Sequence, residues 1–307
     1  MVVQQETKPE CPSCGGASKH AFSAKDWNQQ ASDETFEYFN CDLCKLTFIK
    51  NIPKNLDQYY LNEQYNILDS LSAFLPHANS QAWKVDLLKS FIDDGSLLEI
   101  GPATGEFAYM ARQAGFKPKL LEMDENCCRF LREVLDLDVT QTNTPTEYLA
   151  ANCSIDSGRK FDAICIWQVI EHIPEFWKLL DGAADCLNNN GVLVVSTPNP
   201  ASFQALALGS RWPHIDAPRH LYLIPQDWFV SFAQRHNLSV DLKTTRDVGS
   251  LGLNYYGWYL AVRNFFPRKF SDRRIHSIAR WITRWARRRE EAEGGGCSYT
   301  VVLRRCK

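Results

Sequence analysis

The alternation of short apolar runs with amphipathic stretches over residues 97–196 constrains the fold most. Apolar runs cover residues 97–100, 119–122, 161–167 and 192–196, and stretches with helical spacing cover 107–113, 127–134 and 176–187. Strands that alternate with helices in this way predict an α/β fold, in which helices cover both faces of a parallel sheet. Ligands of such sheets bind at the carboxyl ends of the strands, so the loops after Ile100, Leu121, Ile166 and Val195 are the expected site.

The remaining chain divides around this core. We predict a cysteine-bearing module over residues 1–55, a helical connector over 56–82 and the sheet core over 83–250. An aromatic and basic helical insertion follows over 251–297, and a closing strand covers 298–307. A helix over 228–235 and a strand over 239–244 extend the core before the insertion, which is too long for a plain hairpin loop.

Composition is that of an ordinary globular chain. Its 307 residues are 45% hydrophobic and 23% charged. The apolar runs are far shorter than the roughly 20 residues that a membrane-spanning helix needs, and the polar start lacks the apolar centre of a signal peptide. The 11 cysteines are odd in number and spread over a chain that is too large to need a disulfide scaffold. The cysteine usage therefore favours a reducing cytoplasm.

The net charge of −2 hides a local asymmetry. Residues 1–262 hold 21 Lys+Arg against 32 Asp+Glu, whereas residues 263–290 hold 10 against 2. A protein that binds nucleic acid through its whole surface is therefore not expected. Peripheral contact of residues 263–290 with an anionic surface remains open.

Two Cys-x-x-Cys pairs mark the N-terminal module. Cys11 and Cys14 form the first pair, and Cys41 and Cys44 form the second. Each pair can place two thiolates on one turn, so the four predict a structural, tetrahedral zinc site without an open coordination position. The other seven cysteines lack this spacing and are predicted to pack in helices or the core.

A glycine loop links the first predicted strand to a helix. Gly101 and Gly105 lie in this loop, but the Gly-Lys-Ser/Thr of a phosphate-binding loop and the third glycine of a dinucleotide fingerprint are missing. Glu99 inside the first strand and Glu122 at the end of the second suit a ligand with a cationic amino-acid end and a ribose. Carboxylate oxygens can accept both ribose hydroxyls.

These residues carry a family resemblance. Leu98-Glu-Ile-Gly-Pro-Ala-Thr-Gly105 resembles motif I of class I S-adenosylmethionine-dependent methyltransferases, and Glu122 matches their ribose-binding acid. Residues 161–174 and 191–199 are similar to the fourth and fifth strands with their loops. Residues 216–225 resemble the Pro-x-His segment of the ubiquinone-biosynthesis-like and polysaccharide or natural-product branch. The resemblance implies a Rossmann-like seven-stranded sheet and S-adenosylmethionine as cofactor.

The resemblance also implies the cofactor-binding residues. Gly101, Ala103 and Gly105 would let the backbone approach the methionine part, Glu122 would hold the ribose, and Trp167 and Gln168 would lie near the adenine and sulfonium. The full predicted set is Glu99, Gly101, Ala103, Thr104, Gly105, Glu122, Met123, Trp167 and Gln168. The loop over 142–146 lacks the Asp that often meets the adenine amine.

Two histidines are the candidate catalytic residues. Methyl transfer is an in-line displacement, so the protein aligns the reactants and removes a proton from an acceptor that is not already nucleophilic. A histidine with a near-neutral pKa suits this role. His172 and His220 follow strands of the core, and His214 shares the loop of His220. Each can be a base, a substrate contact or a structural residue.

The basic insertion has a helical pattern. Over 273–289 one predicted stripe holds Ile275, Ile278, Trp281, Ile282 and Trp285, with arginines on the remaining surface. This pattern is typical of a helix that packs on the sheet, covers the active site, or lies on an anionic or membrane surface.

The sequence thus predicts methyl transfer from S-adenosylmethionine to an oxygen or carbon of a small or carrier-linked metabolite, such as a glycan, lipid-linked or natural-product intermediate. An RNA methyltransferase that grips RNA with its zinc module is the alternative. Residues 1–55 mix basic and acidic side chains without a basic stripe, and the Asn/Asp-Pro-Pro-Tyr/Phe loop of base amino methylation is missing, so nucleic acid is not the expected acceptor. A third hypothesis is that the protein binds the cofactor without catalysing a reaction.

Overall fold

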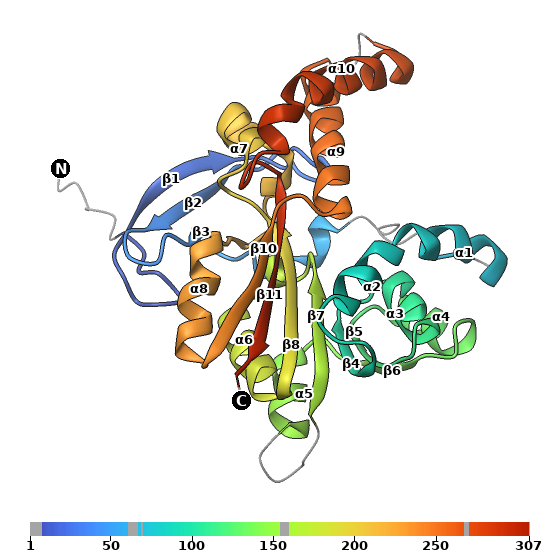
Figure 1. Ribbon diagram of the computed structural model, residues 1–307. Coiled ribbons are helices and arrows are strands. Elements are labelled where there is room, and N and C mark those ends of the chain that lie inside the picture. The colour runs from blue at the N-terminus through green and yellow to red at the C-terminus, as the bar shows by residue number, and fades with distance from the viewer. Residues whose placement is uncertain (1–7, 61–66, 69, 154–159, 267–269, 307) are drawn as a thin grey trace.

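A seven-stranded mixed sheet in the order β10-β11-β8-β7-β4-β5-β6 forms the centre of the molecule (Figure 1). The structure is a computed structural model that describes residues 8–60, 67–68, 70–153, 160–266 and 270–306. The strands are β4 Gly95–Ile100, β5 Phe116–Glu122, β6 Asp138–Gln141, β7 Phe161–Trp167, β8 Leu187–Pro198, β10 Leu238–Thr244 and β11 Ser298–Arg305. Neighbours from β8 to β6 pair in parallel, and β11 runs antiparallel between β8 and β10. The predicted Rossmann-like α/β sheet with its closing strand is confirmed.

Helices cover both faces of this sheet. Residues 163–167 of β7 and 192–195 of β8 are continuously apolar because both faces of the sheet are buried there. On one face α2 and α3 pack on the sheet, with α1 and α4 beside them, and α5, α6 and α8 cover the other face. The helices are α1 Leu71–Ser80, α2 Ala82–Lys89, α3 Glu106–Gln113, α4 Glu125–Glu133, α5 Pro145–Asn152, α6 Phe176–Asp185, α7 Phe203–Leu208, α8 Gln226–Arg235, α9 Val248–Phe265 and α10 Asp272–Glu290. Short 3₁₀ turns are η1 Asp57–Tyr59, η2 Ile170–His172, η3 Gly209–Arg211 and η4 Pro213–Ile215.

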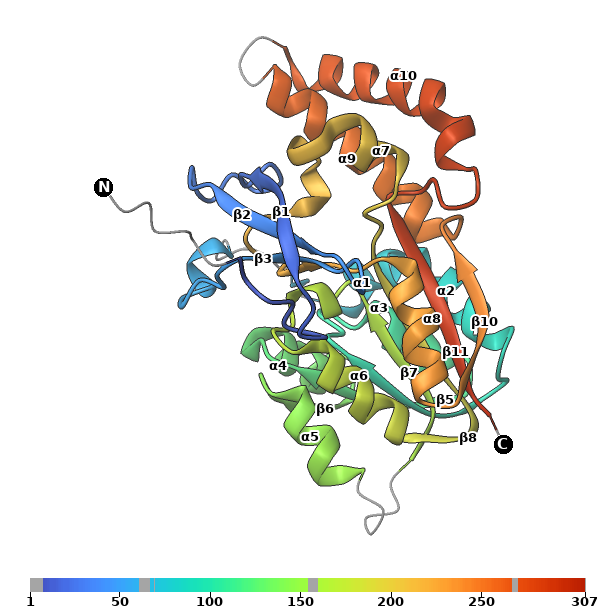
Figure 2. The same ribbon diagram turned by 90° about the vertical axis from the view of Figure 1, so that its left-hand side faces the viewer.

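The N-terminal module shares a second sheet with the core. Strands β1 (Ser18–Ala24), β2 (Phe36–Cys41) and β3 (Thr47–Ile49) are joined by β9 (Tyr222–Leu223), which belongs to the loop before α8. Strand β3 pairs antiparallel with β9 through Thr47 with Leu223 and Phe48 with Tyr222. Figure 2 shows this small sheet lying across the large one. The module therefore packs directly on the chain that follows β8.

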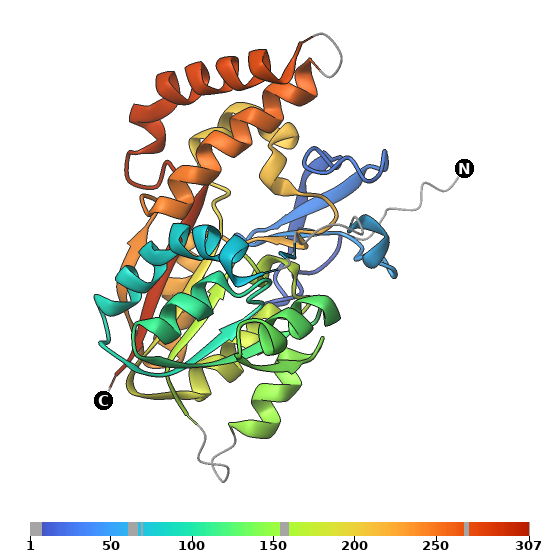
Figure 3. The ribbon, with the colours of Figure 1, turned by 90° about the vertical axis from the view of Figure 1, so that its right-hand side faces the viewer.

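Helices α9 and α10 form a hairpin that stands beyond the large sheet together with α7 (Figure 3). The stripe predicted for α10 lies in two environments. Ile275 is buried, but Trp281 and Trp285 are 68% and 63% exposed, and Ala279 and Ala286 are buried on the packed side. Small alanines let α10 approach α9 closely, so the packed side centres on them and not on the tryptophans of the stripe. Over the described residues, no helix combines the length and apolarity needed to cross a membrane.

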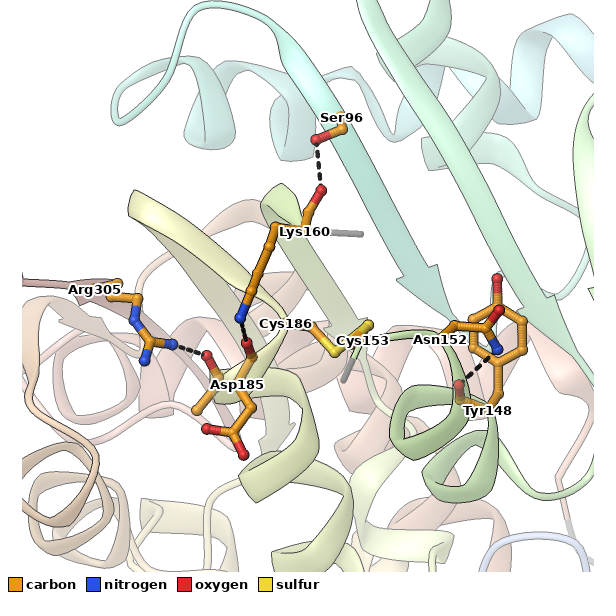
Figure 4. The surroundings of a disulfide bond; sticks show 9 residues. Ser96, Tyr148, Asn152, Cys153, Lys160, Asp185, Cys186 and Arg305 are labelled. Carbon is orange, nitrogen blue, oxygen red and sulfur yellow. Dashed lines mark hydrogen bonds between the residues drawn. A yellow bond between two sulfur atoms is a disulfide. The ribbon is translucent and has the colours of Figure 1, made fainter. Parts of the chain in front are cut away.

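One cysteine pair departs from the prediction that the seven remaining cysteines only pack. Cys153 at the end of α5 and Cys186 just after α6 form a disulfide (Figure 4). The two residues are 33 positions apart. The two cysteines meet because of the way α5 and α6 pack on the sheet, so their spacing in the sequence does not predict the disulfide.

Candidate functional site

The loop after β4 forms the wall of a cavity. The cavity has a volume of about 360 Å³ and its lining comes from α1, α2, β4, the 101–106 loop, α3 and the end of β7. Gly101 has a φ of +72°, and a Cβ at this position would lie only 2.5 Å from Cγ2 of Val169. Glycine is therefore required here by the left-handed backbone and by the close approach of the loop after β7.

Five of the nine predicted cofactor residues line this cavity. They are Glu99, Gly101, Ala103, Thr104 and Trp167. Gly105 instead caps α3 with a φ of +84°. Met123 is 62% exposed, and the side chain of Gln168 donates to the hydroxyls of Ser196 and Ser298 at 2.8 and 2.7 Å. Gly105, Glu122, Met123 and Gln168 are not among the residues that line the cavity in the described chain.

Glu122 is held by backbone amides. One carboxylate oxygen accepts from the amides of Met123 and Asp124 at 2.8 and 2.9 Å, and the other accepts from Ala103 at 3.0 Å. Burial raises its pKa, and the amide hydrogen bonds oppose this. Through the Ala103 amide Glu122 holds the glycine loop in place, and the residue is only 3% exposed. Any contact with a ribose would use the remaining lone pairs of the same oxygens.

A basic and an acidic side chain line the cavity together. Lys84 from α2 and Glu99 from β4 both line it, and Lys84 Nζ lies 4.9 Å from the ring centroid of Trp167. Burial raises the pKa of Glu99 to about 8, while Lys84 opposes the rise. Burial also lowers the pKa of Lys84, against the pull of Glu99 and Glu106. Lys84 is not among the residues predicted from the sequence, because a single lysine in an amphipathic helix belongs to no motif.

The cavity fits the amino-acid end of S-adenosylmethionine. The Oε2 atom of Glu99 and the Nε1 atom of Trp167 are buried and have no hydrogen-bond partner in the described chain. A buried polar atom without a partner is costly, so a ligand that supplies one is favoured. Lys84 can pair with the carboxylate of a zwitterion, and a bound ammonium would favour the carboxylate form of Glu99, so the two side chains match both ends of the ligand.

A second cluster lies on the loop after β7. Trp167 ends β7 at the cavity, and η2 places Glu171 and His172 a few residues later. The rings of His172 and His220 meet edge to face with centroids 4.6 Å apart. One ligand-type atom each of Glu171, His172 and His220 lies within 4.8 Å of the others. The structure therefore brings together the two histidines that the sequence proposed.

Hydrogen bonds fix the orientation of these imidazoles. His172 Nδ1 lies 3.0 Å from the carbonyl oxygen of Arg219 and 3.1 Å from the Tyr60 hydroxyl. His220 Nδ1 lies 2.9 Å from the carbonyl oxygen of His214. A carbonyl beside Nδ1 favours the tautomer that donates from Nδ1 and leaves Nε2 as the proton acceptor.

The environment of His220 differs from the near-neutral histidine that the sequence suggested. Burial lowers its pKa to about 3, although Asp216 opposes the change. Burial likewise lowers the pKa of His172 and of His214, whose Nε2 lies 3.2 Å from the Leu253 carbonyl oxygen. Burial raises the pKa of Glu171 to about 8. The imidazoles are therefore neutral at physiological pH.

A buried ion-pair network holds this cluster against the N-terminal module. Arg219 donates to both carboxylate oxygens of Asp26 at 2.7 and 3.0 Å, and to those of Asp216 at 2.5 and 3.1 Å. Burial alone would raise the pKa of Asp216, but His220 and Arg219 lower it to about 2. The Tyr38 hydroxyl donates to the carbonyl oxygen of His220 at 2.8 Å. Asp26, Tyr38 and Arg219 had no sequence signal, because their pairing is long-range.

The four predicted metal ligands converge. Cys14 Sγ lies 3.5 Å from the Sγ atoms of both Cys41 and Cys44, and Cys11 Sγ lies 3.7 Å from that of Cys44. Four sulfurs at about 2.3 Å from one zinc ion would lie about 3.8 Å apart in a regular tetrahedron. The amides of Leu43 and Cys44 point at Cys41 Sγ, at 3.3 and 3.4 Å. The donor set and its spacing therefore fit zinc.

Comparisons with known proteins give the following similarities. Among solved structures, the chain is similar to a SAM-dependent methyltransferase from Archaeoglobus fulgidus, with 16% identity, a TM-score of 0.49, and coverage of 74% of this chain and 94% of that chain. A second is an S-adenosylmethionine-dependent methyltransferase from Mesorhizobium loti, with 11% identity, a TM-score of 0.45, and coverage of 74% and 98%. No curated protein sequence gives a significant match.

A family model described as a methyltransferase domain matches residues 67–243. This match covers more than half of the chain and includes the glycine loop, the cavity and the loop after β7. The chain therefore belongs to the methyltransferase-domain family and is an S-adenosylmethionine-dependent methyltransferase.

Proposed function

We propose that this enzyme transfers the methyl group to an oxygen or carbon of a small or carrier-linked metabolite, which reacts beside His172 and His220. The observation that carries the proposal is the short loop after β7. It connects Trp167, on the wall of the cofactor cavity, to His172, in ring contact with His220. An acceptor at this loop would lie between a methyl donor and an imidazole.

The cofactor cavity has a positioning role in this proposal. Bound S-adenosylmethionine supplies an electrophilic methyl group on a sulfonium. Lys84 and Glu99 would hold its carboxylate and ammonium ends, and the 101–106 loop would offer its backbone to the ligand. Fixing one reactant in this way lowers the entropic cost of an in-line reaction.

His220 is proposed to take the acceptor's proton at Nε2. Asp216 Oδ2 lies 3.6 Å from this nitrogen, and Glu171 Oε1 lies 4.0 Å from it. The Asp216 carboxylate can stabilise the imidazolium that forms, and the carbonyl at Nδ1 holds the ring in place. Because its pKa is low, His220 is a weak base before the acceptor binds. The acceptor group is therefore expected to be acidic or strongly nucleophilic itself. His172 is the second candidate for the same step.

The N-terminal module is proposed to bind one structural zinc through Cys11, Cys14, Cys41 and Cys44. The closed set of four thiolates leaves no position for water or substrate, so the metal would stabilise the fold and not take part in the reaction. The module then presents Asp26 and Tyr38 to the segment that carries His220.

The first experiment tests the cavity. We expect calorimetry to show one S-adenosylmethionine per chain, and Glu99→Gln and Lys84→Met to weaken binding about 10- to 100-fold, because each removes a charge-assisted contact. Lys45→Met, in the N-terminal module, is the matched control and should bind normally. Unchanged affinity for S-adenosylmethionine in both cavity variants would show that the cofactor does not bind in this cavity.

The second experiment identifies the acceptor class. Extracts are incubated with the enzyme and S-adenosylmethionine that carries a labelled methyl group, and the products are separated before and after nuclease treatment. The proposal expects label in nuclease-resistant small or carrier-linked molecules, lost in His220→Ala. Label that nuclease releases as nucleotides would assign RNA as the acceptor and refute the proposed class.

A further inference from the structure

Buried hydrogen bonds and close packing hold α10 in place against α7 and α9, so its outer face has a defined position. Buried Glu290 accepts hydrogen bonds from Gln204 Nε2 at 2.9 Å and from Trp258 Nε1 at 2.6 Å. Gln204 Nε2 also donates to the carbonyl oxygen of Asn254 at 2.6 Å. These bonds join α7, α9 and α10, and alanines fill the contact between α9 and α10. The packed side of α10 is thus complete, and the other side faces solvent.

That solvent side combines arginine with tryptophan. Trp281 and Trp285 are 68% and 63% exposed. At 100° per residue they lie within the arc that also carries Arg274 and Arg288. All seven arginines of the helix are exposed: Arg273, Arg274, Arg280, Arg284, Arg287, Arg288 and Arg289.

Acidic side chains scarcely offset this charge. Of the two acids in α10, Asp272 begins the helix and Glu290 is buried on the packed side. Arg287 pairs with Glu291 just beyond the helix at 2.7 Å. The whole chain holds 34 Lys+Arg against 36 Asp+Glu, so this positive face stands on a protein that is otherwise acidic. Such a face is complementary to a negatively charged surface.

The tryptophans decide which negative surface fits. The Trp285 ring contacts Phe203 and Arg289, with 6.3 Å between the ring centroids and 5.6 Å to the guanidinium. Large indole rings exposed among arginines are typical of helices that lie in the plane of a bilayer, with rings at the headgroup level and guanidinium groups on phosphates. A single-stranded nucleic acid is usually held in a groove that follows its backbone, whereas this arginine and tryptophan face belongs to one helix.

We propose that the outer face of α10 binds the surface of membranes that contain anionic phospholipids. This role is independent of the methyl acceptor. It concerns where the enzyme works, and the surface is formed by residues 272–290, apart from the cofactor cavity and the histidine cluster.

Vesicle cosedimentation of the full chain tests the proposal. Wild type should bind vesicles of phosphatidylcholine with phosphatidylglycerol and not vesicles of phosphatidylcholine alone. Arg284→Gln/Arg288→Gln should weaken binding about 25-fold, because each basic residue near an anionic surface contributes about fivefold. Trp281→Ala/Trp285→Ala should weaken it by at least about tenfold at the same salt, because the inserted apolar area is lost.

Controls separate this result from misfolding and from general charge effects. Arg129→Gln on α4 and Leu43→Ala in the N-terminal module remove an exposed arginine and an exposed apolar residue elsewhere, and should bind vesicles like wild type. Every variant should keep its affinity for S-adenosylmethionine. A failure of wild type to bind anionic vesicles would overturn the proposal. So would unchanged binding of the tryptophan variant, or tighter binding of a single-stranded RNA oligonucleotide than of the vesicles.

Discussion

The cofactor cavity and the histidine cluster lie on either side of one loop but are built in opposite ways. Most of the cavity comes from a continuous segment, β4 with its loop and the start of α3. The histidine cluster is assembled from η2, the segment around Arg219 and His220, and residues of the N-terminal module. The cavity depends on local backbone geometry, whereas the cluster depends on docking between distant parts of the chain.

The two regions also differ in how their polar groups are satisfied. In the cavity Glu99 and Trp167 each leave a buried polar atom without a partner in the described chain. In the cluster each imidazole has a carbonyl or hydroxyl at Nδ1, and Arg219 is paired with two carboxylates, although Glu171 Oε1 is buried without a partner in the described chain. The cavity leaves its acid and its indole open to a ligand, while the protein itself holds the imidazoles and the guanidinium of the cluster. Damage to one region should therefore leave the other measurable.

Loss of the zinc ligands is expected to give the largest difference between the two regions, with methyl transfer lost and cofactor binding kept. Cys11→Ser/Cys44→Ser should abolish zinc binding and methyl transfer, because the module that carries Asp26 and Tyr38 loses its metal support. Affinity for S-adenosylmethionine should change little. Mass spectrometry of bound metal, calorimetry and turnover measure the three effects, with exposed Cys306→Ser as control. A full complement of zinc in the double variant, or a parallel loss of cofactor affinity, would contradict the separation.

His220→Ala should act within the cluster alone. If His220 accepts the acceptor's proton, turnover falls about 10²- to 10⁴-fold while affinity for S-adenosylmethionine stays near that of wild type. Steady-state kinetics and calorimetry measure both. Wild-type turnover should also fall in acid, well below pH 6.5, and the variant should lose this dependence. If instead His172→Ala alone loses activity, the base is His172, and if both variants keep it, the acceptor needs no protein base.

Glu122→Ala should affect cofactor binding and leave the histidine cluster and the zinc site intact. We expect a loss of about 2 to 4 kcal/mol in the binding free energy of S-adenosylmethionine, because the carboxylate anchors the amide of Ala103 and, by the family resemblance, would accept from the ribose hydroxyls. Calorimetry measures the loss, and the zinc content should stay full. Glu125→Ala, an exposed acid on α4, is the control. Wild-type affinity in Glu122→Ala would remove this residue from the cofactor site.

The effect that is smallest per step, here one pH unit, is a pH dependence of stability. Burial lowers the pKa of His220 to about 3, whereas a histidine in an unfolded chain titrates near 6.5. Below about pH 6.5 the unfolded chain binds a proton that the folded chain does not, so the free energy of unfolding falls as pH decreases. The slope from His220 is at most about 1.4 kcal/mol per pH unit.

Urea denaturation of wild type and His220→Gln across this range isolates the contribution of His220, since all other titrating groups are shared. The stability of wild type should fall more steeply with acid than that of the variant. Parallel curves would mean that His220 is not buried as a neutral group.

The contrast also explains what the sequence could predict. Strand and helix order, the glycine loop and the four cysteines are local patterns, and each appears in the structure as expected. Lys84 was missed because it reaches the cavity from α2, and nothing in its neighbours marks it. The network of Asp26, Tyr38 and Arg219 was missed because it joins residues more than 180 positions apart. The disulfide and the exposed tryptophans of α10 depend on helix packing in the same way.

The pairing of β3 with β9 has a consequence for the order in which the chain can fold. During synthesis the N-terminal module leaves the ribosome first, but one edge of β3 stays without its partner until Tyr222 and Leu223 have been made. An open strand edge is a site for pairing with other chains. The nascent protein therefore carries an unpaired edge of β3 while most of its core is translated, and in that interval the edge is open to pairing with other chains.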